Sequence, residues 1–188
     1  GKQEVYTQGL HISKDAIINA QLFKDNLALG RAFSDTIYYH KAINASVVVN
    51  VAPHPAYGAG GTDALINGVL GSNTRFADKQ WLGFWGDDLQ ITITFAKPTK
   101  ISKISTRFYK ANGQWLYAPK TLEIQTDFGT LPMVKLPATD QPILDVNLKA
   151  EGITSFIKIL VPSFGVIPDG LQGAGNKAWT FIDEIIVK

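Results

Sequence analysis

Apolar and polar residues alternate along most of this chain. The alternation is clear in residues 16–23, 47–51, 91–95, 104–108, 122–124, 157–161 and 181–187. Successive side chains of a β-strand point to opposite faces of a sheet, so this period of two predicts strands with one buried face. Only residues 62–69 and 27–33 could hold a helical turn or two, because no segment sustains the 3.6-residue period of a long helix.

Turn-forming residues separate the predicted strands. The clusters are Lys24-Asp25-Asn26, Asn112-Gly113, Asp127-Phe128-Gly129 and Pro168-Asp169-Gly170. Gly, Asn, Asp and Pro favour the backbone conformations of tight turns. Many short strands with such connections predict an all-β protein, either a sandwich or a jelly roll.

The chain divides into two parts near residues 42–52. Before this point, two strands over residues 12–23 and 32–40 form a hairpin, and a lone hairpin is at best marginally stable. After it, about 140 residues are enough for one β-sandwich. We therefore expect residues 1–42 to be strands from the end of a preceding small domain, and residues 43–188 to be one jelly-roll domain.

Composition excludes several classes of partner and chemistry. The 188 residues are 45% hydrophobic and 18% charged, as in folded proteins, and the net charge is only +2. Nucleic acid is therefore not expected as a partner. The chain has no Cys, which excludes disulfides and zinc–thiolate sites, and no apolar stretch of the ~20 residues that span a bilayer. Because it begins with Gly1 rather than Met, we interpret the chain as a piece of a longer protein.

Five ordered blocks make the second part recognisable. They are residues 40–42 (HKA), 64–72 (ALINGVLGS), 81–89 (WLGFWGDDL), 115–119 (WLYAP) and 178–185 (AWTFIDEI). In this order they resemble the discoidin, or coagulation factor V/VIII type C, family, which is shared with the family-32 carbohydrate-binding modules. More narrowly, residues 40–188 resemble the C-terminal region of bacterial exo-β-N-acetylhexosaminidases of glycoside hydrolase family 20. Residues 5–40 resemble the last strands of the small β-domain that often precedes this module, and the matching stretch is residues 9–20 followed by Phe23-Lys24.

The resemblance implies a fold and a role. The fold would be a discoidin-like β-sandwich, and the role that of a non-catalytic accessory module of a secreted bacterial glycoside hydrolase. Its partners would be glycans ending in an amino sugar or a galactose-type sugar, or the catalytic domain of the parent enzyme. The location would be periplasmic, outer-membrane-associated or extracellular. Two alternatives stay open, a purely structural spacer and a discoidin-type surface that binds protein or lipid.

Aromatic residues are the main candidates for binding. Sugar rings stack their C–H faces on flat aromatic rings, while polar side chains bind the hydroxyls. Trp81, Phe84 and Trp85 lie within five residues, beside glycines that indicate a loop. The full predicted set is Trp81, Phe84, Trp85, Trp115 and Tyr117 as platform residues, with Arg75, Asp87 and Arg107 as polar partners. The alternative for each tryptophan is packing in the core.

A structural calcium ion is also implied by the resemblance, near the start of the sandwich and its last strand. Calcium binds six to eight oxygen ligands, many of which can come from a Gly-rich loop. The corresponding residues here are Asp63, Asn67, Ser72 and Glu184, although the family usually has Asp where this chain has Asn67. The alternatives are that Asp63 caps a short helix and that Glu184 faces solvent.

Catalysis is not expected from this chain. Asp183-Glu184 is similar to the adjacent Asp-Glu pair of the exo-hexosaminidases, but that pair acts at the mouth of a (β/α)₈ barrel of about 250 residues. No barrel fits in this chain. Neighbouring side chains in a strand also point to opposite faces, so the two carboxylates could not converge on one bond.

Overall fold

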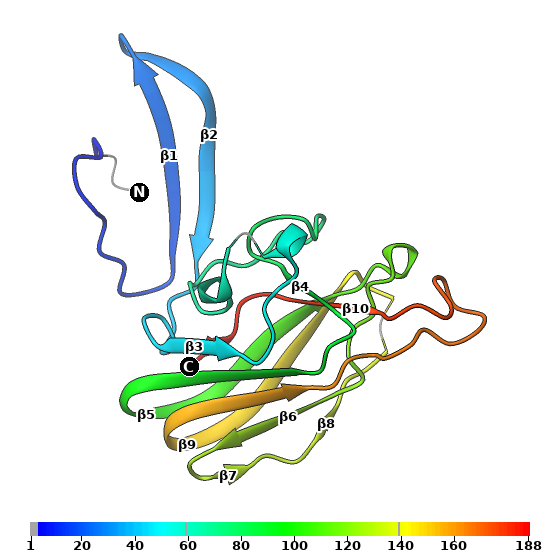
Figure 1. The fold of residues 1–188 in the computed structure, drawn as a ribbon. Helices are drawn as coiled ribbons and strands as arrows, with labels where there is room; N and C mark the ends of the chain where they lie inside the picture. Colours follow the sequence, from blue (N-terminus) through cyan, green and yellow to red (C-terminus); the bar gives the residue numbers. More distant parts are fainter. Residues whose placement is uncertain (1–3, 59, 139) are drawn as a thin grey trace.

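The computed structural model describes residues 4–58, 60–138 and 140–188, and nearly all of its regular structure is β (Figure 1). The strands are β1 (Ala16–Lys24), β2 (Leu27–Ile37), β3 (Ser46–Val49), β4 (Leu82–Trp85), β5 (Leu89–Tyr109), β6 (Thr121–Thr126), β7 (Gly129–Thr130), β8 (Val134–Lys135), β9 (Ile143–Val161), β10 (Trp179–Ile182) and β11 (Ile186–Val187). Short 3₁₀ turns are η1 (Pro55–Tyr57), η2 (Thr62–Leu65) and η3 (Asn112–Gln114). Among the described residues, no helical segment has the length and apolarity to cross a bilayer.

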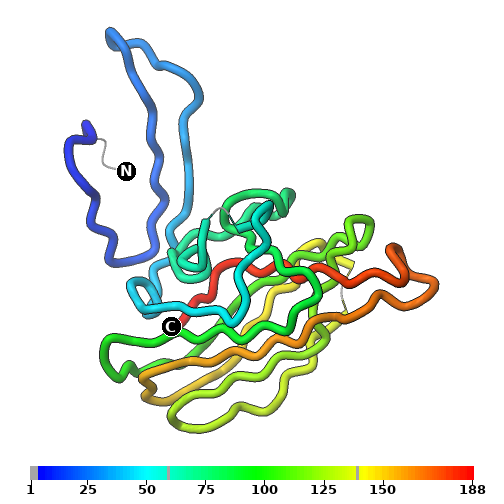
Figure 2. Tube along the Cα trace, viewed as in Figure 1, coloured from blue at the N-terminus to red at the C-terminus, as the bar shows by residue number. Residues whose placement is uncertain are grey.

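Two long strands build both layers of a sandwich. β5 and β9 pair along most of their lengths, and their register shifts between Thr94 and Thr99 and again between Ile101 and Lys103. At this point both strands bend back, so each contributes to the two layers, as Figures 1 and 2 show. The first half of β5 also pairs with β3, and its second half pairs with β10 and β11.

The core lies between these layers and follows the predicted alternation. Every second residue at the start of β5 is buried, and β6 and β9 show the same period of two. The buried side chains include Leu89, Ile91, Ile93, Ile104, Phe108, Leu122, Ile124, Leu144, Ile157 and Ile159. The predicted fold class, an all-β sandwich preceded by a small hairpin, is therefore confirmed.

The hairpin β1–β2 forms a separate two-stranded sheet that projects from the sandwich (Figures 1 and 2). Its turn at Asp25 and Asn26 has φ angles of 51° and 63°, the paired left-handed residues of a type I′ turn. The prediction of a helical turn over residues 27–33 was wrong, because this segment is part of β2 and pairs with β1. Within residues 27–33, Leu27, Ala28, Leu29 and Phe33 lie opposite residues of β1.

Candidate functional site

The segment around Trp85 is a strand, not the loop that its glycines suggested. β4 pairs antiparallel with β10, placing Trp85 opposite Trp179 and Gly83 opposite Phe181. A Cβ atom at Gly83 would lie 2.7 Å from the Phe181 ring and 2.8 Å from Tyr57 Cβ. This glycine therefore permits close packing of rings against β4. The loop prediction failed because glycine occurs both in loops and in strands, where it allows other groups to pack closely against the backbone.

Trp81 and Phe84 are buried and cannot form a sugar-binding platform. Phe84 is 1% exposed and belongs to the core between the layers. Trp81 is 0% exposed, and its Nε1–H donates to Ser72 O at 3.0 Å. Its ring meets Tyr109 edge to face, with centroids 5.2 Å apart. Both residues were predicted to contact a ligand, and the structure corrects this, because a ring enclosed by protein has no free face.

Trp85 is the one predicted platform tryptophan that remains half exposed, at 48%. Its indole stacks on Trp179 with centroids 5.8 Å apart and an interplanar angle of 16°. Its Nε1–H donates to Lys177 O at 3.1 Å. Trp179 is in turn held edge-on by His54 and Tyr57, at centroid distances of 5.1 and 5.3 Å. The result is a flat aromatic surface whose orientation is fixed from several sides.

Trp115 and Tyr117 anchor a neighbouring loop instead of joining Trp85. The Tyr117 hydroxyl donates to Gln172 O at 2.8 Å, and the ring lies against Phe164 at 4.7 Å. Trp115 packs closely on Gly173, where a Cβ would lie 2.4 Å from Trp115 Cδ1. Tyr117 is 5% exposed. The predicted role of Tyr117 in stacking on sugar is corrected to packing of the loop over residues 162–178, whereas Trp115 packs on the same loop and stays partly exposed.

The three predicted polar partners divide into one buried and two exposed residues. Arg107 is the buried one, and its guanidinium group is hydrogen-bonded inside the protein. Nε and Nη2 donate to Asp183 Oδ2, Nη1 donates to Asn73 Oδ1, and Nη2 also donates to Gly71 O. All three guanidinium nitrogens are therefore hydrogen-bonded within the protein. Arg75 and Asp87 are exposed, and Asp87 follows Trp85 by two residues.

Sequence reasoning missed three residues that define the platform. His54 reaches Trp179 from η1, Lys177 supplies the carbonyl that orients Trp85, and Trp179 supplies the stacked partner. Trp179 was not among the predicted platform residues. No spacing in the sequence connects residues 54, 85 and 179, because the pairing of β4 with β10 brings them together.

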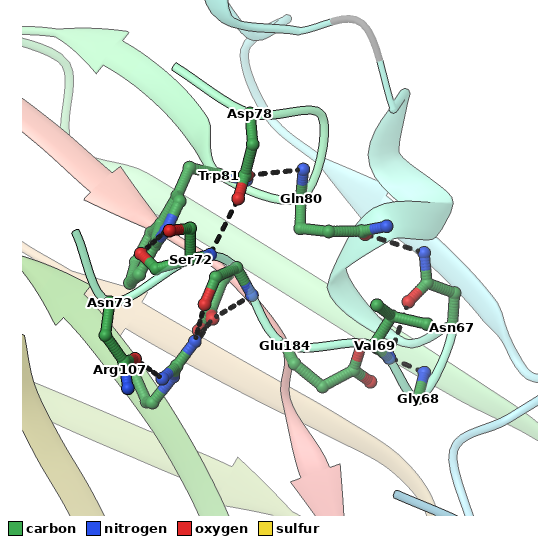
Figure 3. A network of polar contacts seen from close by, with 12 residues as sticks. Asn67, Gly68, Val69, Ser72, Asn73, Asp78, Gln80, Trp81, Arg107 and Glu184 are labelled. Carbon is green, nitrogen blue, oxygen red and sulfur yellow. Dashed lines mark hydrogen bonds and ion pairs between the residues drawn. The ribbon is translucent and has the colours of Figure 1, made fainter. Parts of the chain in front are cut away.

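Hydrogen-bond donors face the carboxylate of Glu184, one of the predicted calcium ligands, and two of them are the backbone N–H groups of Gly68 and Val69 (Figure 3). Glu184 is 1% exposed, and its oxygens accept from His40 Nε2 at 2.7 Å, Gly68 N at 2.9 Å and Val69 N at 3.2 Å. His40 Nδ1 accepts from Ala42 N, so the ring proton lies on Nε2. Glu184 does not face solvent, and its carboxylate is already satisfied.

The other three predicted ligands do not complete a cation site. Asn67 Oδ1 accepts from Val69 N, and Ser72 Oγ lies 3.3 Å from Thr74 Oγ1. Asp63 is exposed within η2, whose N-cap is Gly61 rather than Asp63. Over residues 4–58, 60–138 and 140–188, no three His, Asp or Glu side chains gather in one place where they could hold a metal ion. The donor set therefore does not fit calcium, because N–H groups occupy the place that a cation needs.

We expect the melting temperature to be the same in 5 mM EDTA and in 5 mM CaCl₂, because Glu184 is satisfied by N–H donors. Differential scanning calorimetry measures this directly. A bound structural ion at a large excess over its Kd would stabilise the fold by about 3 kcal/mol, which raises the Tm of a domain of this size by about 6–12 °C. A rise of that size in CaCl₂ would restore the calcium prediction.

Comparisons with known proteins find likeness in structure only. No family model and no curated protein matches the chain. The lectin domain of lectinolysin, complexed with Lewis B antigen, is 12% identical with a TM-score of 0.49, covering 80% of this chain and 96% of that one. A fucose-binding module of Streptococcus pneumoniae is 13% identical with a TM-score of 0.48, covering 79% and 94%. The family 32 carbohydrate-binding module of C. perfringens NanJ, in complex with galactose, is 13% identical with a TM-score of 0.47, covering 76% and 92%.

Proposed function

We propose that this chain is a carbohydrate-binding accessory module and that the exposed face of Trp85 is its principal sugar contact. The observation that supports this is an indole that is 48% exposed yet fixed by stacking on Trp179 and by a hydrogen bond to Lys177 O. A ring held in place loses little conformational entropy when a ligand stacks on it. The exposed carboxylate of Asp87, two residues away, is the proposed acceptor for sugar hydroxyls.

The module is proposed to be non-catalytic and to belong to a secreted bacterial glycoside hydrolase of the β-N-acetylhexosaminidase type. Both carboxylates of the Asp183-Glu184 pair are buried, one bound to Arg107 and the other to His40. Neither is available to an open active site. One stacked sugar ring would give a binding free energy of about 4–6 kcal/mol, or a Kd between millimolar and tens of micromolar. Attachment to an enzyme would raise the effective concentration of substrate.

Trp85→Ala is expected to weaken sugar binding at least about tenfold, because it removes the only fixed, half-exposed indole of the platform. Isothermal titration calorimetry with N-acetylglucosamine and galactose tests this. Phe23→Ala is the matched control, since Phe23 is an exposed aromatic ring (58%) on the separate hairpin. Equal binding by Trp85→Ala and the unmodified chain would exclude the platform, and binding of neither sugar by the unmodified chain would argue against recognition of these sugars.

A structural spacer is the second candidate function, and the hairpin favours it. Register places Leu22 opposite Leu29, Lys24 opposite Leu27 and Ala20 opposite Phe33, so four large apolar side chains share one face. These four, Leu22, Leu27, Leu29 and Phe33, are each 55–73% exposed. We propose that residues 1–42 belong with a neighbouring β-domain that covers this face, and that residues 43–188 form the sandwich domain. If the unmodified chain binds no sugar in the titration above, the structural spacer is the candidate function that remains.

A further inference from the structure

A concave pocket lies beside the loop over residues 162–178, apart from the residues that hold Trp85. Its volume is about 340 Å³, at the lower end of the range of about 300–1,000 Å³ for small-molecule sites. Its walls include Pro119, Leu136 and Pro137, and its polar groups include Lys110, Lys120 and Asp140. The size suits one sugar residue, and the polar groups carry a net charge of +1.

The pocket has walls held by the backbone of the sandwich. Leu136 N donates to Lys120 O at 2.8 Å, and Lys110 N donates to Pro142 O at 2.7 Å. These bonds tie the segment before β9 to the residues that follow β5 and precede β6. The site is therefore largely formed before any ligand arrives, which lowers the entropic cost of binding.

Aromatic packing positions one of the two ammonium groups. Lys120 Nζ lies 4.4 Å from the centroid of the Phe164 ring, a cation–π contact. The Phe164 ring also packs on Tyr117, whose hydroxyl is bound to Gln172 O. The charge of Lys120 is thus held at the pocket by a ring that is itself fixed. Phe164 positions a cation here and does not offer a free face for stacking.

The carboxylate in the pocket is weakly engaged. Asp140 Oδ1 lies 3.7 Å from Lys110 Nζ, beyond hydrogen-bond distance, and the Asp140 side chain is fully exposed. Exposed ion pairs of this kind contribute about 0–1 kcal/mol. The exposed Asp140 carboxylate can therefore give way to an incoming anion that lies near Lys110 and also meets Lys120.

We infer that this pocket binds the acidic group of a charged sugar, either the carboxylate of a uronic acid or the sulfate of a sulfated amino sugar. The inference rests on the proposed function in taking the ligand to be a glycan. The two ammonium groups recognise the negative charge, and the proline and leucine walls contact the sugar ring. Carboxylate and sulfate share this chemistry, so the ligands used in the test distinguish them.

The test is calorimetric titration with N-acetylglucosamine, N-acetylglucosamine 6-sulfate and glucuronic acid at low salt. At least one of the acids is expected to bind about tenfold more tightly than the neutral sugar, and the preferred acid identifies the anion. Lys120→Gln is expected to remove this tenfold advantage, and Asp140→Asn is expected to strengthen binding of the acid about twofold to fivefold, because a competing negative charge is lost. Sodium chloride at 0.5 M is expected to reduce the advantage by screening.

Trp85→Ala separates this inference from the proposed function. In that variant the advantage of the acid over the neutral sugar is expected to persist, since Lys110 and Lys120 are unchanged. If Lys120→Gln binds both acids as tightly as the unmodified chain does, or if neither acid binds more tightly than N-acetylglucosamine, the pocket is not an anion site. That outcome leaves the result for Trp85 and the neutral sugar unaffected.

Discussion

Arg107→Met is expected to lower the free energy of unfolding by about 3–5 kcal/mol at pH 8, the cost of breaking one side of a buried ion pair. Arg107 is 8% exposed and Asp183 0%. The substitution leaves the Asp183 carboxylate in the interior with only the Gly71 amide as a donor. It also leaves Gly71 O and Asn73 Oδ1 without their Arg107 donors. Urea unfolding followed by circular dichroism measures the change.

The stability lost in Arg107→Met should depend on pH, in a direction that follows from the pKa of Asp183. Burial raises the pKa of Asp183 from 3.8 to about 7, against the lowering effect of the hydrogen bonds and charge of Arg107 and of the Gly71 amide. Because the folded pKa lies above the unfolded one, the folded state holds this proton more tightly. The stability that this group contributes is fully present below about pH 4 and is lost as the pH rises through about 7.

Removal of Arg107 takes away a group that lowers the pKa of Asp183, so that pKa rises further in Arg107→Met. At pH 5 the carboxyl is protonated in both proteins, and the difference between them shrinks to the lost hydrogen bonds, about 1–3 kcal/mol. Above about pH 7 Asp183 ionises beside Arg107 in the unmodified protein, which then loses no further stability, whereas Arg107→Met, with its higher Asp183 pKa, goes on losing stability as the pH rises. The difference in free energy of unfolding between the two proteins should therefore increase from pH 5 to pH 8. A difference that stays constant or decreases would contradict this account of the pair.

Lys149→Met is the matched control for Arg107→Met. Lys149 forms an ion pair with Glu151 at 3.3 Å, but the two side chains are 83% and 63% exposed. Solvent screens such a pair, so the substitution should change the free energy of unfolding by no more than about 0.5 kcal/mol. A comparable loss in the two variants would mean that burial of Asp183 is not the cause.

The layers of the sandwich could be predicted from the sequence because burial alone determines the pattern. Ile91, Ile93 and Ile157 alternate with polar residues because one face of each strand meets the core. The alternation of apolar and polar residues does not show which strands pair, since every half-buried strand has the same pattern. The bend that folds β5 back near Thr94–Thr99 was also not predicted. The sequence predicted two strands, in residues 91–95 and 104–108, where the structure has the single strand β5.

The site was harder to predict because its partners are remote in sequence. Trp85 and Trp179 stack, Lys177 fixes Trp85, and His40 contacts Glu184 across 144 positions. Such contacts depend on strand register, which the sequence of a single segment does not encode. The sequence did not determine exposure either. Trp81 and Trp85 occur in the same block, but Trp81 is buried and Trp85, the last residue of β4, is half exposed.

Trp81→Ala is expected to destabilise the fold by about 3–5 kcal/mol, the usual cost of removing a large buried aromatic side chain. The surrounding structure can do little to fill the space. Gly71 presses on the indole so closely that a Cβ there would lie 2.3 Å from Trp81 Nε1, and Tyr109 and Arg107 contact the ring. The Nε1–H bond to Ser72 O is lost as well. Urea unfolding at pH 7 measures the effect, with Trp85→Ala as the control.

These two tryptophan variants should show opposite effects, which makes the pair informative. Trp85 is half exposed, so its loss removes one stacking contact and one hydrogen bond and should cost only about 1 kcal/mol of stability. It should, however, weaken sugar binding, whereas Trp81→Ala should retain binding at temperatures where it is still folded. If Trp81→Ala lost sugar affinity while it remained fully folded and stable, the aromatic surface that contacts the ligand would have to include the ring that the structure places inside.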